Sequence, residues 1–447
     1  MDTKVVKEGH ELYAVTDSNH IRPERYTSPT FCADEHDRMW SRVWQMACRV
    51  EDLPKVGNYV EYEVGDQSVL VVRHGEGPQD IKAFMNACRH RGRQLANGSG
   101  TFRGRKIVCR FHGWAWNLDG SNSTVFGGDL GFDPSIVRAE DVGLLECKVG
   151  VWSEMVFVSL DPEVELLDQY LAPIAPVVRP VAVERMRTVW WHQIQVDANW
   201  KLCLEAFMEG YHVCYTHPQM IFANKPDPGM PNSLILKTLQ HGHTYFHPNP
   251  DGRNWKQEYT KEAAQVDPFD RLVDTLRTLS PVLQREIDVI ESLRGKPVPQ
   301  GSSVEAEAIK AVYADAALRG VEMPSPQVAL TWGSVYHVFP NLVIYPFFGN
   351  CWLMRARPNG PDKSLVDIWL LTLPGKGEQF PKPKCEGPYR SDDADHISLI
   401  TVQDFGNLEP VQRGMKTKGL GALRLSNRWE ALITHRHQEI DRYLGLR

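Results

Sequence analysis

Two short cysteine–histidine pairs, close together in the chain, limit what this sequence can fold into. Cys88 pairs with His90, and Cys109 pairs with His112, with 18 residues between the two pairs. Each pair directly follows a short apolar run that reads as a β-strand. Two neighbouring strands that end in such loops bring the four side chains together, so they form a complete ligand set for one metal centre.

The mixture of ligands within each loop decides between two kinds of centre. Two thiolates and two imidazoles fit tetrahedral zinc, or an iron–sulfur cluster in which histidines replace cysteines on one iron. Zinc sites usually keep like ligands together, as Cys-x2-4-Cys and His-x3-5-His. Here each loop supplies one ligand of each type, so both thiolates can hold an inner iron and both imidazoles an outer iron. The spacing favours a [2Fe-2S] centre for single-electron transfer, with zinc as the alternative.

A second candidate site lies farther along, at His212 and His217, where residues 200–215 read as a helix. Side chains five residues apart on a regular helix point about 140° away from each other. Pro218 disfavours α geometry at His217, and a helix that breaks there lets both imidazoles face one metal. Sixteen histidines make a chance pair common. However, an electron relay needs an acceptor, and two histidines with one carboxylate are the iron ligands of non-haem Fe(II) oxygenases.

Both sites together resemble those of the Rieske non-haem iron oxygenases, the terminal oxygenase (alpha) subunits of the ring-hydroxylating oxygenases. Residues 88–92 and 109–114 are similar to the two cluster loops of that family. Residues 199–217 are similar to its Asn-Trp-Lys and Glu-Asn-x-x-Glu-x-Tyr-His-x4-His motifs, although Ala206 stands where asparagine is common. The resemblance implies a [2Fe-2S] cluster and a mononuclear non-haem Fe(II). Their ligands would be Cys88, His90, Cys109 and His112 for the cluster, and His212 and His217 for the iron.

The third iron ligand in that family is an aspartate far downstream, shortly before a Gln-Arg-Gly-like turn. Residues 402–414 fit this description, so the resemblance implies that Asp404 completes the mononuclear site. Competing carboxylates lie in a polar stretch that we expect to be exposed. They are Asp392, Asp393 and Asp395.

Glu209 occupies the place of a carboxylate that, in that family, joins the mononuclear iron to the Rieske histidine of a neighbouring subunit. It precedes His212 by three residues, so on a helix the two side chains would face the same way. The alternative for Glu209 is a solvated helix residue. Glu205 is a further candidate for supporting the iron site, whereas Tyr211 and Asn199 are expected to be structural.

The resemblance implies that the chain is the terminal oxygenase of a multicomponent system. Electrons from NAD(P)H would come from a separate reductase, directly or through a ferredoxin, since the sequence lacks a Gly-x-Gly-x-x-Gly nucleotide fingerprint. The cluster of one subunit would feed the iron of the next in a homotrimer, with or without a small beta subunit. As a Rieske-type monooxygenase or dioxygenase, the chain would use O2 to hydroxylate or dihydroxylate an apolar aromatic or alicyclic substrate, as in aromatic hydrocarbon catabolism. The alternatives are an O- or N-demethylating monooxygenase, an electron-transfer iron–sulfur protein without oxygenase activity, and a zinc-stabilised binding protein.

Length and periodicity indicate an α+β fold with more than one domain. Residues 44–160 alternate short β segments with turns and read as a small all-β Rieske domain. The resemblance implies that residues 161–447 form a larger catalytic domain, an antiparallel sheet covered by helices of the helix-grip type. It contains a helical insertion at about 267–323, expected to serve packing rather than to act as a lid. Residues 1–43 are expected to be an N-terminal arm that packs on the catalytic domain.

Composition excludes several kinds of partner. The net charge of −6 gives no overall basic surface, so nucleic acid is not expected to bind. No apolar run approaches the roughly 18 residues that span a bilayer, and the first residues contain no signal-peptide core. The cysteines outside the two pairs show no disulfide-like spacing. The chain is therefore expected in the cytoplasm, away from membranes.

Two surfaces are also predicted. Basic residues crowd around the cluster loops and are expected either to dock an acidic electron donor or to form an ordinary solvated face. They are Arg89, Arg91, Arg93, Arg103, Arg105, Lys106 and Arg110. Nine apolar residues are candidates for lining a substrate pocket, the alternative being ordinary core. They are Phe207, Met208, Val213, Met220, Phe222, Phe339, Phe347, Phe348 and Trp352.

Overall fold

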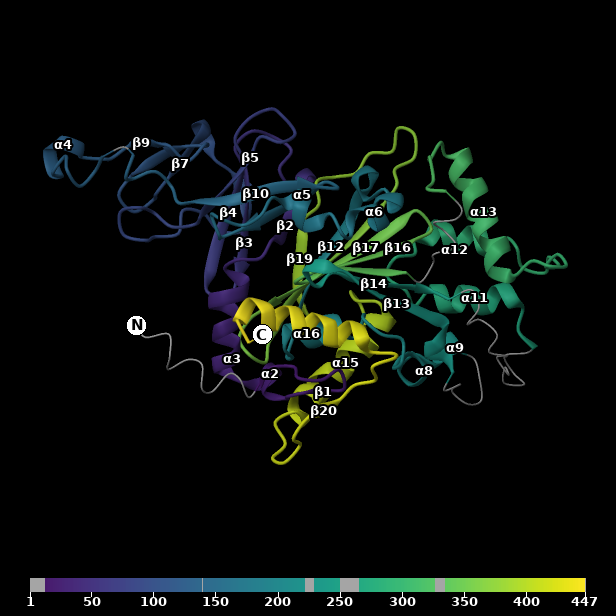
Figure 1. Ribbon diagram of the computed structural model, residues 1–447. Helices are drawn as coiled ribbons and strands as arrows, with labels where there is room; N and C mark the ends of the chain where they lie inside the picture. Colours follow the sequence, from purple (N-terminus) through teal and green to yellow (C-terminus); the bar gives the residue numbers. More distant parts are fainter. Residues whose placement is uncertain (1–12, 139, 222–228, 250–264, 326–333, 447) are drawn as a thin grey trace. The chain divides into compact units, whose positions relative to one another are not determined.

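The computed structural model describes residues 13–138, 140–221, 229–249, 265–325 and 334–446 (Figure 1). The chain divides into two compact units. His36–Tyr170 form the smaller unit, and Met1–Glu35 together with Leu171–Arg447 form the larger one. The domain boundaries expected after residues 43 and 160 stay a prediction.

The smaller unit is built on an antiparallel sheet with the strand order β2-β11-β10-β5-β4-β3-β6. Its strands are β2 (Gln45–Arg49), β3 (Asn58–Val64), β4 (Gln67–Arg73), β5 (Ile81–Met85), β6 (Ser99–Thr101), β10 (Glu146–Trp152) and β11 (Met155–Ser159). A three-stranded sheet contains β7 (Lys106–Val108), β8 (Ala115–Asn117) and β9 (Asn122–Thr124). Short helices α4 (Gly128–Gly131) and α5 (Leu167–Leu171) complete the unit. The expected small all-β domain is confirmed.

The core of this unit reaches up to the cluster loops. Strand β3 alternates buried residues with more exposed ones, as a strand does when one face packs on a core. Leu70 and Phe84, from the neighbouring strands β4 and β5, belong to the same buried cluster as Cys88, Cys109 and Trp116. The two candidate cysteine ligands therefore stand at the rim of a rigid apolar core rather than on free loops.

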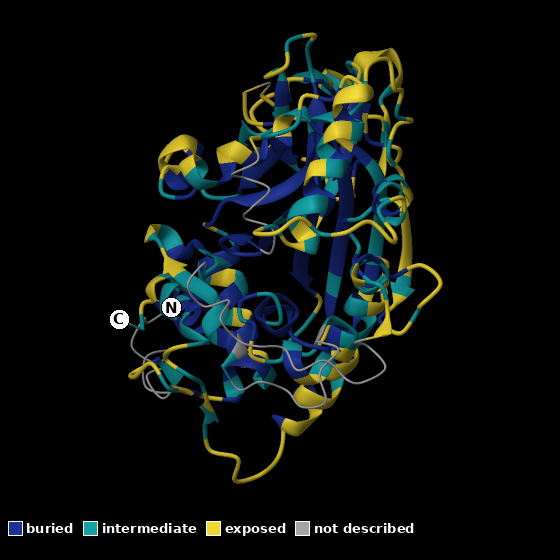
Figure 2. Cartoon of the chain, turned by 90° about the vertical axis from the view of Figure 1, so that its right-hand side faces the viewer, coloured by how far each residue is buried: buried dark blue, intermediate teal, exposed yellow. Residues whose placement is uncertain are grey.

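The larger unit is built on an eight-stranded sheet with the order β13-β14-β15-β16-β17-β18-β12-β19. Its strands are β12 (Arg187–Val196), β13 (Leu234–Thr238), β14 (Thr244–Pro248), β15 (Val335–Val338), β16 (Leu342–Phe347), β17 (Asn350–Pro358), β18 (Ser364–Thr372) and β19 (Cys385–Arg390). Neighbouring strands are antiparallel except β12 and β19, which run parallel. Every residue of β17 is buried, and the neighbouring strands β15, β16 and β18 are mostly buried too, which is why strands in the middle of this unit appear dark blue in Figure 2. The predicted antiparallel sheet is confirmed, with one parallel edge strand.

Helices cover this sheet, and one of them, α15 (Leu399–Gly414), carries the candidate ligand Asp404. Helix α7 (Trp200–Glu205) contacts β17 and β18, and α15 contacts both α7 and β12. The Asn199 side chain caps α7 by accepting a hydrogen bond from the backbone N–H of Lys201. Other elements of the unit are β1 (His20–Ile21), α2 (Glu24–Thr27), α3 (Pro29–Asp34), α6 (Ala175–Val178), α8 (Val213–Thr216), α9 (Pro218–Ile221), β20 (Leu423–Arg424) and α16 (Ala431–Leu444). Across the described ranges, no helix has both the length and the apolar character needed to cross a membrane.

Three helices occupy the stretch where a helical insertion was expected: α11 (Pro268–Leu276), α12 (Gln284–Glu291) and α13 (Val304–Leu318). The Asp267 side chain caps α11 by accepting from the N–H of Phe269, with proline at the first helical position. Phe269, Ile290 and Val312, one from each helix, share a buried cluster with Phe347. The periodicity of the apolar residues is thus explained by packing between the helices.

The prediction of one continuous helix over residues 200–215 is wrong. Helix α7 ends at Glu205, and helical structure resumes only at Val213 in α8. The Glu209 carboxylate accepts hydrogen bonds from the backbone N–H groups of Tyr211 and His212. These bonds take two backbone donors away from a regular helix. The Gln-Arg-Gly segment at 412–414 also differs, since it is the last part of α15 and not a turn.

A buried polar network joins α2 to α16 within the larger unit. Arg25 Nη1 lies 2.5 Å from Asp441 Oδ1, and both side chains are fully buried. Arg25 Nε also lies 2.9 Å from His437 Nδ1. Glu205 closes the network, because Tyr26 Oη donates to its carboxylate at 3.0 Å and His437 Nε2 lies 2.9 Å from it. Burial raises the pKa of Glu205 to about 7.

Asp441→Ala is expected to lower the free energy of unfolding by about 3–5 kcal/mol, because Arg25 would keep its charge without a counter-ion in a dry site. Denaturant unfolding followed by circular dichroism measures the change. The matched control is Asp392→Asn, whose carboxylate pairs with Arg390 on the surface, and it should leave the midpoint unchanged. Equal midpoints for both variants would show that the Asp441 carboxylate does not stabilise the fold.

Candidate iron centres

The two cluster loops have the same backbone turn. In the first loop, the N–H of Cys88 donates to the carbonyl of Arg93 at 2.9 Å, and the N–H of Gly92 donates back to the carbonyl of Cys88 at 2.9 Å. The second loop repeats these two bonds around Cys109 and Gly113, at 2.8 and 3.0 Å. Both glycines have a φ of 72°, which glycine adopts without a Cβ penalty. One turn geometry, used twice, explains why each loop presents a cysteine and a histidine.

The four side chains separate into an inner and an outer pair. The thiols of Cys88 and Cys109 are buried and close enough to hydrogen-bond to each other. The imidazoles are half-buried, with the ring centroids of His90 and His112 4.7 Å apart. Burial and the neighbouring His112 lower the pKa of His90, which favours the neutral imidazole that binds metal. These donors fit a [2Fe-2S] cluster with thiolates on an inner iron and imidazoles on an outer one.

Trp114 is a cluster-loop residue whose role the sequence did not reveal. Its ring stacks on His90 with centroids 5.0 Å apart and planes 9° from parallel. Phe132 packs edge-on against both rings. These contacts fix the orientation of the His90 imidazole, so its ligating nitrogen is placed before any metal binds.

The three candidate ligands of the mononuclear site come from two helices. His212 is the N-cap and His217 the C-cap of α8, so this short helix holds one imidazole at each end. Asp404 lies in α15 and its side chain is buried. One ligand atom from each of the three residues lies within 4.8 Å of the other two. Asp404 Oδ1 is 3.0 Å from His217 Nε2 and 3.4 Å from His212 Nε2.

The far nitrogens of both imidazoles are held by oxygen atoms. His212 Nδ1 lies 2.5 Å from Glu209 Oε1, and His217 Nδ1 lies 2.9 Å from the amide oxygen of Gln403. Each Nδ1 therefore carries a proton, and each Nε2 faces Asp404. Asp404 Oδ1 is buried and faces both ring nitrogens, which present lone pairs to a metal once they are deprotonated. Three lone pairs that converge in this way fit a cation, and two histidines with one carboxylate are a ligand set of non-haem Fe(II).

The metal-free site predicts a pH-dependent affinity. Burial lowers the pKa of His212, but hydrogen bonds to Asp404 and Glu209 outweigh this effect and raise the pKa to about 10. A metal ion must displace that proton at any pH below this value. Apparent affinity should therefore increase with pH, by up to about tenfold per unit between pH 6 and pH 8. Titration with Co(II), followed by its absorption, measures the slope; a flat profile would contradict the prediction.

The competing carboxylates lie elsewhere. Asp392 and Asp395 are exposed, and Asp393 lies 2.9 Å from the imidazole of His396. Glu205 has its described contacts in the buried network with Tyr26 and His437, so no described contact links it to the iron ligands.

Gln403 was missed by sequence reasoning. Its amide oxygen also accepts from the side chain of Gln219, at 2.8 Å. Its place directly before Asp404 was the only available signal, and nothing in the sequence shows that it faces His217.

The candidate pocket residues occupy different surroundings. Phe207 packs on Trp352 with ring centroids 5.0 Å apart, and the carbonyl of Phe207 accepts from His337 Nε2 at 2.8 Å. Met208 is buried, and Val213 and Met220 are half-buried. Phe339 stacks on Tyr443. Phe347 and Phe348 pack in the core of the three-helix insertion, and Phe222 lies outside the described residues. Their pocket role stays a prediction.

Two family models match the chain. Residues 183–446, more than half of the chain, match the ring hydroxylating alpha subunit (catalytic domain), and residues 43–125 match the Rieske [2Fe-2S] domain. The chain is 31% identical over 207 residues to the glycine betaine monooxygenase oxygenase subunit of Chromohalobacter salexigens, covering 45% of this chain and 44% of that protein. It is 30% identical over 217 residues to the alpha subunit of biphenyl 2,3-dioxygenase from Rhodococcus jostii, covering 47% and 46%. The chain thus spans less than half the length of these relatives.

A solved structure shares the fold over nearly the whole chain. The quaternary ammonium Rieske monooxygenase CntA, in complex with L-carnitine, superimposes with a TM-score of 0.62 and covers 95% of each chain. Sequence identity over this superposition is 17%, so the likeness concerns the fold alone.

Proposed function

The chain belongs to the ring-hydroxylating oxygenase alpha subunits, with a Rieske domain and a mononuclear iron domain, and from this premise we propose that it is the terminal oxygenase of a multicomponent system. The cofactors of this family are a [2Fe-2S] cluster and a non-haem Fe(II). When bound, the cluster supplies single electrons and the Fe(II) reacts with O2 at open coordination positions. The observation that carries the proposal is the convergence of ligand atoms from His212, His217 and the buried Asp404, all within 4.8 Å of one another.

The chain's own residues position these cofactors. We assign Cys88, Cys109, His90 and His112 to the cluster, and His212, His217 and Asp404 to the iron. Glu209 and Gln403 hold the two iron-site imidazoles through Nδ1, which fixes the tautomer that presents Nε2. In an assembled homotrimer Glu209 would also join this site to the cluster of a neighbouring subunit, and a separate NAD(P)H-dependent reductase would supply electrons.

For the substrate, we favour a small compound that carries an N-methyl or quaternary ammonium group. Two proteins similar to this chain are named for glycine betaine and for quaternary ammonium compounds. Hydroxylation of one methyl group uses one O2, two electrons and two protons, and yields water and a carbinol. The carbinol then loses formaldehyde and leaves the demethylated amine, so the overall reaction is a demethylating monooxygenation.

Phe207, five residues before His212 in the sequence, forms an aromatic pair with Trp352 that supports a cationic substrate. Their ring centroids lie 5.0 Å apart. The faces of such rings attract quaternary ammonium groups by about 0.5–2 kcal/mol. A substrate of this class carries a positive charge, but its methyl groups make apolar contacts. We propose it in place of the purely apolar substrate expected from the sequence.

Hydroxylation of an aromatic or alicyclic compound is the second candidate. The match to a biphenyl dioxygenase alpha subunit favours it at nearly the same identity. The buried Met208 and the half-buried Val213 and Met220 would suit such a substrate equally well.

Turnover with a reconstituted reductase separates the two candidates. Glycine betaine, choline and L-carnitine form one arm of the panel, and biphenyl and toluene form the other. Formaldehyde or an oxidised amine, formed with one O2 consumed per product, supports the first candidate. A diol or phenol formed only from the hydrocarbons would overturn it. The His212→Ala variant should keep the cluster spectrum unchanged but form no product. This result would show that either activity depends on the iron site.

A further inference from the structure

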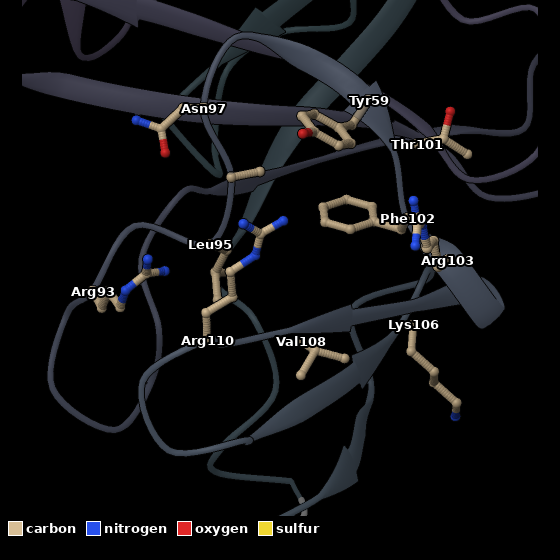
Figure 3. Close-up of a pocket in the computed structure, with 11 residues that line it drawn as sticks. Tyr59, Arg93, Leu95, Asn97, Thr101, Phe102, Arg103, Lys106, Val108 and Arg110 are labelled. Atoms are coloured by element: carbon tan, nitrogen blue, oxygen red, sulfur yellow. The ribbon is translucent and has the colours of Figure 1, made fainter.

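A concave site lies in the smaller unit, beside the cluster loops and apart from the iron ligands. It has a volume of about 640 Å³, and Tyr59 and Phe102 form its aromatic wall, with ring centroids 4.5 Å apart. Three arginines, Arg93, Arg103 and Arg110, line the rest of its mouth (Figure 3). We call it the basic pocket.

The charge around the basic pocket is opposite to that of the whole chain. Residues 88–110 contain seven basic residues and no aspartate or glutamate, whereas the chain carries a net charge of −6. No acidic residue lines the pocket. A negatively charged protein would therefore be repelled by most of this molecule and attracted here, which orients an encounter before contact.

Two of the pocket's cations are available to a partner. Lys106 is engaged, because its Nζ contacts the side chains of Asn117 and Ser123, and Figure 3 shows it pointing away from the pocket centre. Arg103 and Arg110, in contrast, are exposed and make no hydrogen bond or ion pair with other described residues. Figure 3 shows Arg110 directed toward Phe102 and Tyr59. A guanidinium group without an internal partner can bind a carboxylate in bidentate fashion.

The pocket wall is continuous with the cluster loops. Arg110 directly follows Cys109 in the sequence, and the carbonyl of Arg93 accepts the N–H of Cys88 at 2.9 Å. Phe111, the next residue, is more than half exposed. Anything seated in the basic pocket therefore rests on the backbone that carries the cluster ligands, which is where a one-electron donor must approach.

We propose that the basic pocket docks a carboxylate-bearing segment of an acidic iron–sulfur electron donor. The carboxylates pair with Arg103 and Arg110, and an apolar side chain of the donor packs on the Tyr59–Phe102 wall. In the docked complex one electron passes from the reduced donor centre to the oxidised cluster, with no bond formed or broken. The proposal rests on the proposed function in one respect only, namely that the cluster receives electrons from another protein.

The test measures reduction of the cluster and not oxygenase turnover. Its result can therefore be interpreted even if the chain proves to have no oxygenase activity. The probe is an acidic plant-type [2Fe-2S] ferredoxin, photoreduced under argon, whose potential lies below that of histidine-ligated clusters. Stopped-flow absorption of the oxygenase cluster gives the second-order rate constant. Arg103→Glu is expected to lower this constant about tenfold at low ionic strength, with the difference lost at high salt. The rate constant of Arg103→Gln should lie between those of the unaltered protein and Arg103→Glu.

Two matched controls distinguish docking at the basic pocket from a general electrostatic attraction by the basic surface. Arg105→Glu reverses a charge two residues away, at an exposed side chain outside the pocket lining. Arg428→Glu makes the same change on an exposed residue of the other unit. Both should lower the constant by less than about twofold. Reduction of all variants by a neutral photoreductant must proceed at the unaltered rate, with an unchanged cluster spectrum.

Three results would overturn the proposal. The first is an Arg103→Glu rate equal to that of the unaltered protein, and the second is an equal loss in Arg103→Glu and Arg105→Glu, which indicates only a general basic field. The third is saturable binding of inorganic phosphate at the pocket that competes with ferredoxin at constant ionic strength. That result would assign the pocket to a small anion instead.

Discussion

Asp404→Asn is expected to reduce the iron content from about three to about two per chain and to abolish product formation, while the cluster absorption stays unchanged. The amide lacks the negative charge that the convergence of Asp404, His212 and His217 provides. Loss of a contact that only supports a ligand typically costs 10–100-fold. Loss of a ligand itself should therefore lower turnover by more than about 100-fold.

The physical reason lies in the surroundings of the Asp404 carboxylate. Oδ1 is buried, and the Nε2 atoms of His212 and His217 face it at 3.4 and 3.0 Å. Without a cation this site keeps a proton on His212 instead. An asparagine presents either a neutral oxygen or an N–H group to the same two nitrogens. Neither can hold a divalent ion in a buried site, because the charge of the ion would be uncompensated.

Metal analysis and turnover, measured on the same preparation, test this expectation. Asp393→Asn is the matched control. The Asp393 carboxylate pairs with His396 in a polar surface stretch, and Asp393 was one of the alternative third ligands considered from the sequence. It should retain the full iron content and activity. Retention of the third iron by Asp404→Asn would show that another residue completes the site. Loss of the cluster spectrum in this variant would show that the division of ligands between the two centres is incorrect.

The ligand motifs were readable from the sequence because they are local. Cys88 and His90 lie on one loop, Cys109 and His112 on another, and each loop needs only one turn with a glycine at positive φ. Strands that precede the loops are short and strongly apolar. The small all-β domain followed from short β segments separated by turns, whereas the antiparallel sheet was implied by the family resemblance.

Other features depend on contacts distant in sequence and could not be read in this way. Gln403 faces His217 only because α15 packs near α7 and α8. The break after α7 depends on where the Glu209 carboxylate finds donors, and helical periodicity in residues 200–215 pointed to a longer helix. Glu205 lies in a network with α2 and α16, whose ends are more than 200 residues apart. Hydrophobic periodicity cannot predict which distant side chains contact each other, since it shows only which face of a helix or strand is apolar.

Glu209→Ala and Glu209→Gln are expected to differ in a way that separates two roles of this residue. Its carboxylate accepts from the backbone N–H groups of Tyr211 and His212 and lies against His212 Nδ1. Alanine removes all of these contacts and frees both the loop and the imidazole. Iron affinity should therefore fall about 10–100-fold, and turnover with it at limiting iron.

Glutamine has nearly the same shape, and its amide oxygen can still accept from His212 Nδ1. Glu209→Gln should therefore keep most of the iron affinity but lose the negative charge. If Glu209 also joins the iron site to the cluster of a neighbouring subunit, oxidation of the reduced cluster in a single turnover should slow by at least about tenfold in this variant, even with iron saturated. If the role of Glu209 is confined to its own subunit, the Glu209→Gln rate should match that of the unaltered protein while Glu209→Ala remains impaired through iron loss. Rapid-mixing absorption of the cluster, combined with Co(II) titration of both variants, distinguishes these outcomes because the first reports electron delivery and the second reports the ligand environment.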